Sequence, residues 1–141
     1  MKNTSVLFDT NVVIDLITKR SPFADASLRL YEMCNKGSLD GFISAQSIAD
    51  IFFILRKDYP VQRRKEILFD ICTVLNVADV RRWHVLAALS DNAFPDLEDG
   101  ILAKCAEDYG FDFVVSRNTE DFSASKTPVL TPSELFKLLV V

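Results

Sequence analysis

The sequence predicts an α/β fold, a three-layer α/β/α sandwich with a central, mainly parallel sheet. Short apolar runs rich in β-branched and aromatic residues alternate with longer segments whose apolar residues recur at helical spacing. Strands that alternate with helices imply right-handed crossovers and a parallel sheet covered on both faces. At 141 residues the chain can bury a single core, so residues 1–141 are expected to form one domain.

The first half of the chain supplies two strands and four helices. Strands are expected at 5–8 and 41–43, and helices at 12–17, at 24–34, between Ser44 and Leu55, and at 63–75. Ala24, Leu28 and Tyr31 recur at helical spacing in the second helix. Ser44 is placed to cap the third helix, and Phe69 is among the apolar residues of the fourth that are available for burial.

The second half supplies the remaining elements. Strands are expected at 76–80, 113–116 and 129–130, and helices at 82–90 and 96–109. Gly110 ends the longer of these helices. A last helix is expected after Thr131, because a threonine cap, a proline at the first helical position and Glu134 three residues past the cap form a capping box.

The composition excludes several kinds of site. Cys34, Cys72 and Cys105 are far apart and lie among helical apolar positions, which predicts buried, unreactive thiols rather than disulfides or a zinc motif. His84 is the only histidine, so a metal site with several histidine ligands cannot form. We expect His84 to lie on the surface or to take part in packing.

Charge and hydropathy indicate where the protein acts. The N-terminus lacks the apolar core of a signal peptide, and no apolar run approaches the roughly 20 residues of a membrane span. We therefore expect a cytoplasmic protein with no membrane partner. The net charge of −4 argues weakly against nonspecific nucleic-acid binding, but clustered acids that hold metal ions would be neutralised locally.

Asp9 directly follows the first predicted strand. In open parallel α/β sheets the functional crevice lies outside the carboxyl ends of the strands, where the chain leaves a strand for the next helix. The alternative interpretation is that Asp9 only caps that helix. Because Thr10 and Asn11 are equally good caps, we expect Asp9 to be free for another task.

Asp96 and Asp99 are three residues apart and share one helical face. The alternative interpretation is that Asp96 is the N-cap after Pro95 and that Asp99 is a first-turn acid favoured by the helix dipole. Ala103 continues the same face with a small side chain, which would let the helix pack closely and carry Asp99 inward.

Three further residues are candidates for the same crevice. Asp50 lies at the edge of an apolar helical stripe, although solvent exposure would also explain it. Asn118 and Asp121 follow a strand, as Asp9 does, and either could instead be a loop cap. Several carboxylates in one crevice would raise one another's pKa values, and a bound cation would relieve the repulsion.

Oxygen ligands without histidine or cysteine suit Mg²⁺ or Mn²⁺ rather than zinc. The candidate metal ligands are Asp9, Asp50, Asp96, Asp99 and Asp121. A metal held there lowers the pKa of a bound water and offsets charge on a leaving oxygen, which is the chemistry needed to hydrolyse a phosphodiester.

Four motifs occur in order along nearly the whole chain: Asp9-Thr10-Asn11 after a strand, the acid Asp50 in the third helix, Asp96-Leu97-Glu98-Asp99, and Ser116-Arg117-Asn118 followed by Asp121-Phe122. As an ordered set they resemble the PIN-domain family, which includes the VapC-type toxin ribonucleases. The resemblance implies a Rossmann-like fold and metal-dependent cleavage of RNA. It also implies a catalytic set of Asp9, Asp50, Asp99 and Asn118, with Asp96 and Asp121 close by, a homodimer, and inhibition by an antitoxin protein.

Two positions depart from the family pattern. Asp50 stands where glutamate is usual, and Asn118 stands where many members have aspartate. The alternative function is therefore a catalytically weak PIN-like domain that binds RNA or a protein partner. A phosphotransfer domain would also use a strand-end aspartate, but its phosphatase signature needs a second aspartate where this chain has Asn11.

Overall fold

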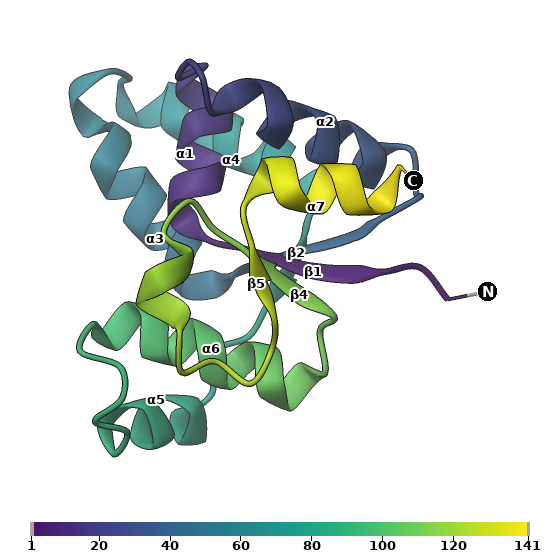
Figure 1. Cartoon of the computed structure of the whole chain (residues 1–141). Helices are drawn as coiled ribbons and strands as arrows, with labels where there is room; N and C mark the ends of the chain where they lie inside the picture. The colour runs from purple at the N-terminus through teal and green to yellow at the C-terminus, as the bar shows by residue number, and fades with distance from the viewer. Residues whose placement is uncertain (1, 141) are drawn as a thin grey trace.

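The computed structural model describes residues 2–140 and has a five-stranded parallel sheet at its centre (Figure 1). The strand order is β3-β2-β1-β4-β5, and every neighbouring pair is parallel. The strands are β1 (Ser5–Phe8), β2 (Asp40–Ser44), β3 (Asn76–Ala78), β4 (Phe113–Val115) and β5 (Val129–Leu130). The predicted α/β class is confirmed.

The connections between strands are helical. The helices are α1 (Thr10–Thr18), α2 (Ala24–Asn35), α3 (Ala45–Ile54), α4 (Val61–Val74), α5 (Arg82–Leu89), α6 (Leu97–Tyr109) and α7 (Pro132–Leu139). Two short 3-10 turns, η1 (Leu55–Lys57) and η2 (Thr119–Phe122), follow α3 and β4. The predicted capping box at the start of α7 is present, with Thr131 and Glu134 bonded reciprocally.

The helices form two layers around the sheet. Alternation along β1 sends Val6 and Phe8 to one face and Leu7 to the other. The first face packs against α1, α2, α3, α4 and α7, and the second packs against α6, whose Leu102 lies in the same cluster as Leu7. Helix α5 packs on α6, outside the sheet, through Ala88.

His84 and two of the three cysteines are buried, whereas Cys72, which was also predicted to be buried, is only partly so. His84 is buried between α5 and α6, where its Nδ1 accepts from the Arg81 backbone N–H at 2.9 Å and its Nε2 contacts Asp108 at 3.0 Å. Cys34 and Cys105 are buried, and burial raises the pKa of each thiol to about 12.

One position predicted to be available for burial is wrong, because Phe69 is 72% exposed. Phe69 is apolar and helical, but the buried stripe of α4 passes through Leu68. Within residues 2–140, no helix is long and apolar enough to cross a membrane.

Candidate active site

Asp9 lies at the carboxyl end of β1 and is buried. Its extended backbone (φ −68°, ψ 154°) makes it the N-cap of α1, and its side chain accepts the Thr10 N–H at 2.7 Å. The expectation that Thr10 or Asn11 would cap this helix is wrong, because the helix begins at Thr10, directly after the strand. Capping uses one carboxylate oxygen, so the other remains available.

Ser116 takes that second oxygen. Strands β1 and β4 pair in parallel with Phe8 opposite Val115, so Asp9 and Ser116, the residues that follow, come side by side. The buried Ser116 hydroxyl donates to Asp9 Oδ2 at 2.7 Å and accepts the Asn118 backbone N–H at 3.1 Å. No role was predicted for Ser116, although the register of two parallel strands places it beside Asp9.

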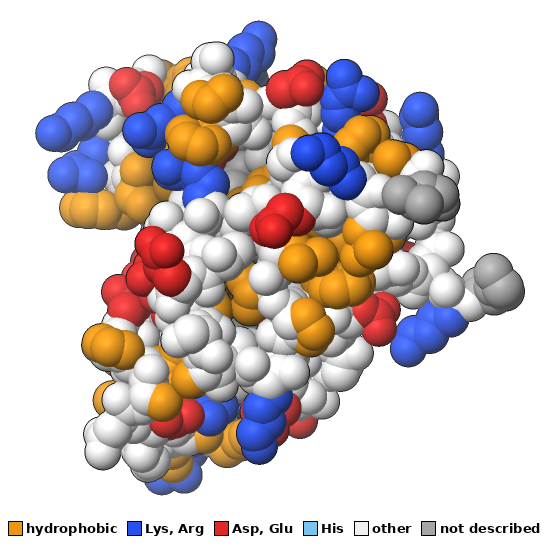
Figure 2. All heavy atoms as spheres, in the orientation of Figure 1, with side chains coloured by type: hydrophobic (Ala, Val, Ile, Leu, Met, Phe, Trp, Pro, Cys, Tyr) orange, Lys and Arg blue, Asp and Glu red, His pale blue; other side chains and the backbone are white. Residues whose placement is uncertain are grey.

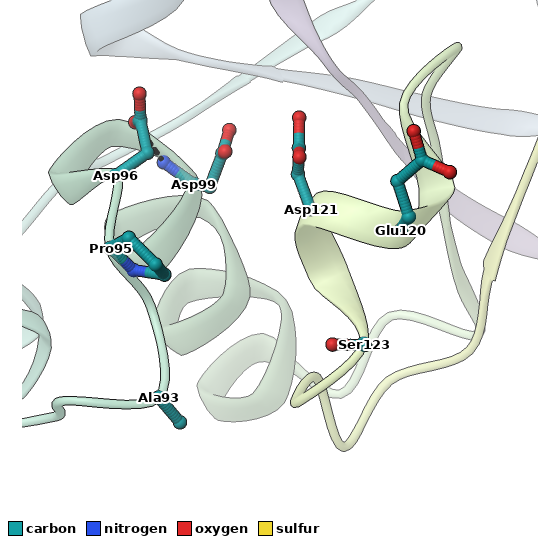
Figure 3. Close-up of a pocket in the computed structure, with 7 residues that line it drawn as sticks. All are labelled: Ala93, Pro95, Asp96, Asp99, Glu120, Asp121 and Ser123. Carbon is teal, nitrogen blue, oxygen red and sulfur yellow. Dashed lines mark hydrogen bonds between the residues drawn. The ribbon is translucent and has the colours of Figure 1, made fainter.

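Helix α6 brings Asp96 and Asp99 to the same edge of the sheet. Asp96 is the N-cap of this helix, and its Oδ1 accepts the Asp99 N–H at 3.1 Å. Figure 3 shows the carboxylates of Asp96, Asp99 and Asp121 pointing toward the same side, the first from the N-cap of α6, the second from α6 itself and the third from η2. They line a cavity of about 370 Å³ together with Ala93, Pro95, Glu120 and Ser123.

The four aspartates influence one another electrostatically. Burial, and then the charges of Asp96, Asp9 and Asp121, raise the pKa of Asp99 to about 7. Burial is also the main cause of the raised pKa of Asp9; hydrogen bonds from Ser116 and Thr10 offset it, while the charges of Asp96 and Asp121 add to it. Asp9 and Asp99 therefore lie close enough for the charge of Asp9 to raise the pKa of Asp99.

Glu98, for which no role was predicted, links Asp50 to this group. The Glu98 carboxyl lies within hydrogen-bonding reach of Asp50, and this contact is the first cause that raises the pKa of Glu98 to about 7. Burial and the charges of Asp50, Asp96 and Asp9 contribute further. On a helical wheel Glu98 lies about 100° from Asp99, so helical spacing alone did not place both at one site.

The serine cap of α3 fixes the position of Asp50. As predicted, Ser44 caps α3 by accepting the Ser47 N–H at 3.0 Å. Ser47 Oγ in turn accepts from Thr10 Oγ1 at 2.8 Å, which joins the first turns of α1 and α3. Asp50 lies one turn after Ser47, so these hydroxyls hold its helix beside Asp9.

Asn118 is exposed and lies three residues past the end of β4. Its backbone N–H is fixed by Ser116, but its side chain makes no hydrogen bond to the rest of residues 2–140. A neighbouring contact was also missed: Arg117 Nε lies 2.7 Å from Oδ2 of the fully buried Asp15 in α1.

The donor set suits a hard divalent cation. Five aspartates and Glu98 present carboxylate oxygens, and the buried Oδ2 of Asp50 has no hydrogen-bond donor. The acidic side chains are not already arranged around a single point. Within the described chain, no three His, Cys, Asp or Glu side chains form a ready-made metal-binding group. Figure 2 shows acidic side chains gathered at the left of the molecule, below a group of lysine and arginine side chains.

In a comparison with protein families, the model of the PIN domain matches residues 5–120. No curated protein matches the chain.

Solved structures share the fold. The toxin-antitoxin complex from Klebsiella pneumoniae aligns with a TM-score of 0.68 and 23% identity, covering 90% of this chain and 97% of that one. VapBC-1 from nontypeable Haemophilus influenzae aligns with a TM-score of 0.70 and 14% identity, covering 92% of this chain and 99% of that one. VapBC2 from Rickettsia felis, bound to a DNA fragment from its promoter, aligns with a TM-score of 0.68 and 15% identity, covering 90% of this chain and 97% of that one.

Proposed function

The chain belongs to the PIN-domain family, and we propose that it is a divalent-metal-dependent endoribonuclease. The observation that carries the proposal is one cavity lined by Asp96, Asp99 and Asp121, with Asp9 close enough for its charge to raise the pKa of Asp99. No arginine or lysine is among the causes that shift the pKa values of Asp9 and Asp99. A divalent cation is the partner that such a set of oxygens favours.

The proposed ligands of Mg²⁺ or Mn²⁺ are Asp9, Asp50, Asp96, Asp99 and Asp121. When bound, the metal supplies charge stabilisation for the phosphate and lowers the pKa of a bound water. Ser116 and Thr10 hold the Asp9 carboxylate in one orientation. Asp50, Asp99 and Asn118 complete the catalytic set: Asp50 and Asp99 accept protons or metal, and the neutral amide of Asn118 can donate to a phosphate oxygen.

Cleavage of structured and single-stranded RNA, with Mn²⁺ or Mg²⁺ and with EDTA, tests this proposal. Replacing Asp9 by asparagine keeps a helix-capping side chain but removes the charge, so cleavage should fall by at least ~100-fold while the fold persists. Asp25→Asn, the same change on the exposed face of α2, is the control and should leave cleavage unchanged. Undiminished cleavage by Asp9→Asn would reject the assignment.

One observation favours the alternative, a catalytically weak domain that binds RNA or a protein. The acids do not form a ready-made group of three within residues 2–140. Calorimetric titration with Mn²⁺ separates the two functions. Binding that is lost in Asp9→Asn supports the nuclease, whereas a folded protein that binds no Mn²⁺ at millimolar concentration supports the alternative.

We further propose an antitoxin as protein partner, a toxin role, a cytoplasmic site of action, and a homodimer. The solved structures with this fold include toxin-antitoxin complexes. An apolar groove of about 530 Å³ between α3 and α4, which includes Phe52, Leu68 and Phe69, gives a protein partner a surface to cover. Co-expression with the product of the adjacent reading frame, followed by light scattering of the purified complex, tests both the partner and the dimer.

A further inference from the structure

Arg117 connects three segments that are far apart in the chain. Its Nε lies 2.7 Å from Oδ2 of Asp15 on α1, and its guanidinium carbon lies 4.5 Å from the centre of the Phe23 ring, just before α2. Asp15 is fully buried, while the Arg117 side chain keeps 24% of its surface exposed. The contact with the Phe23 face adds a cation–π attraction to the ion pair.

Arg117 stands between two residues of the candidate active site. Ser116 before it holds Asp9, and Asn118 after it is bonded through its backbone to Ser116. The Arg117 backbone N–H donates to Asn11 Oδ1 at 3.3 Å, and the Asn11 amide approaches Ser116 Oγ at 3.5 Å. Both the side chain and the backbone of Arg117 therefore attach residues 116–118 to α1.

The ion pair is not well explained by stability alone. A carboxylate must lose its hydration to occupy the position of Asp15, and an apolar pair of similar volume often stabilises a protein as well or better. Neither Asp15 oxygen meets good hydrogen-bond geometry, nor does Arg117 Nε. A pair that adds little to stability but joins two segments is suited to fixing their relative position.

We propose that the Asp15–Arg117 pair is a positioning device that holds residues 116–118 against α1, and so orients Asp9 and Asn118. The effect of this pair on catalysis depends on the proposed nuclease function. The attachment of residues 116–118 to α1 does not depend on it.

The test compares the wild type with the double variant Asp15→Leu/Arg117→Met, which replaces the pair by apolar side chains and avoids leaving a single buried charge. Amide hydrogen exchange followed by NMR, without metal, should show at least tenfold faster exchange at Arg117 and Asn118. The Val114 amide, bonded within the sheet to the Pro128 carbonyl, should keep its rate. Calorimetric titration with Mn²⁺ should show about tenfold weaker binding.

Two controls separate positioning from loss of stability. Ile71→Val lowers core stability on α4, and it should leave exchange at Arg117 and Asn118 and the Mn²⁺ affinity unchanged. Arg117→Lys keeps the charge, so it should recover part of the wild-type exchange protection.

Unchanged exchange at Arg117 and Asn118 in the double variant would overturn the inference, whatever happens to metal affinity. If the wild type binds no Mn²⁺, the proposed function fails, while the exchange measurement still decides whether the pair positions the segment. Altered exchange with unaltered Mn²⁺ affinity would reject the link between the pair and the metal-binding acids.

Discussion

Asp9 has two roles at once, because it caps α1 with one oxygen and receives the Ser116 hydroxyl with the other. The Ser116 bond lowers the pKa of Asp9 against the effect of burial. At such a junction, one side chain both caps a helix and keeps a carboxylate oxygen in a fixed orientation. The two roles can be separated only by substitutions that alter one bond.

Ser116→Ala removes the hydroxyl that donates to Asp9 Oδ2. The pKa of Asp9 should rise further, because a charge-stabilising bond is lost, so Mn²⁺ binding should require a higher pH than in the wild type. Stability should fall by about 1–3 kcal/mol. Calorimetric titration from pH 6 to pH 8 measures the shift, and Ser123→Ala, which changes a serine of the cavity wall, should not reproduce it.

Glu98→Gln removes one of two acids in contact. The metal-free protein should unfold at a higher temperature at pH 8, by about 2 °C, because like charges no longer meet Asp50. Glu32→Gln, an exposed change on α2, is the control for loss of one negative charge. An equal rise in both variants would mean that net charge, rather than the Asp50 contact, is responsible.

At the scale of residues, the positions of Asp9 and Asp99 follow simple rules, since one directly follows a strand and the other lies in the first turn of a helix. The sequence did not predict their partners. Glu98 meets Asp50 only after α3 and α6 have packed, and Arg117 meets Asp15 only through the tertiary fold. Nothing in the local sequence specifies such contacts.

At the scale of elements, Asp96 answers a question that the sequence left open, since it is both the cap of α6 and an acid of the cleft. Asp96→Asn should keep the cap and leave stability within about 0.5 kcal/mol of wild type or above it, because repulsion is relieved. Asp96→Ala should lose about 1 kcal/mol with the cap. Urea unfolding in EDTA compares them, and equal stabilities would show that the capping bond contributes nothing.

Helix α4 shows why an apolar residue type alone does not predict whether its side chain is buried or exposed. Phe69 and Leu68 are neighbours, but Phe69 is 72% exposed and Leu68 is 5% exposed. Periodicity fixes the angle between two side chains and leaves open which of them faces the sheet. Helix α1 begins at Thr10, two residues before the predicted start at Val12, because strand and helix meet at Asp9 without a loop.

The exposure of Phe69 leads to a prediction about stability. Phe69→Ser should change the free energy of unfolding by no more than about 0.5 kcal/mol, whereas Leu68→Ala should cost about 2–5 kcal/mol. Urea unfolding measures both. A large loss in Phe69→Ser would mean that this face is covered in the isolated protein, for instance by a second copy.

At the scale of the whole molecule, the acid cleft makes stability depend on pH. The pKa values of Asp99 and Glu98 rise from 3.8 and 4.5 to about 7, so the folded state holds these protons more tightly than the unfolded state. The stabilisation is complete below about pH 4 and is lost as the pH rises through 7. The metal-free protein should therefore unfold at a lower temperature at pH 8 than at pH 5.

Mn²⁺ at a hundred times its dissociation constant should return about 2.7 kcal/mol at pH 8. Thermal unfolding at the two pH values, in EDTA and in Mn²⁺, measures both effects. Asp99→Asn should reduce the difference between the pH values. A protein whose unfolding temperature in EDTA rises from pH 5 to pH 8 would contradict the raised pKa values.

The overall architecture was predictable because alternating strands and helices leave few arrangements open, and parallel strands bring their carboxyl ends to one edge. The strand order was not predicted. Placing β1 between β2 and β4 depends on which apolar surfaces pack together across the whole chain. The same arrangement gives Asp9 neighbours from both directions along the sequence.

The bond between Asp9 and Ser116 joins residues 107 positions apart. During translation at roughly 5–20 residues per second, Asp9 is made about 5–20 seconds before its partner. A nascent chain on the ribosome therefore contains the first acid of the cleft long before it contains the residues that orient it. The cleft is completed only when synthesis is nearly finished, so a nascent chain that ends before Asp121 lacks one of the acids that line it.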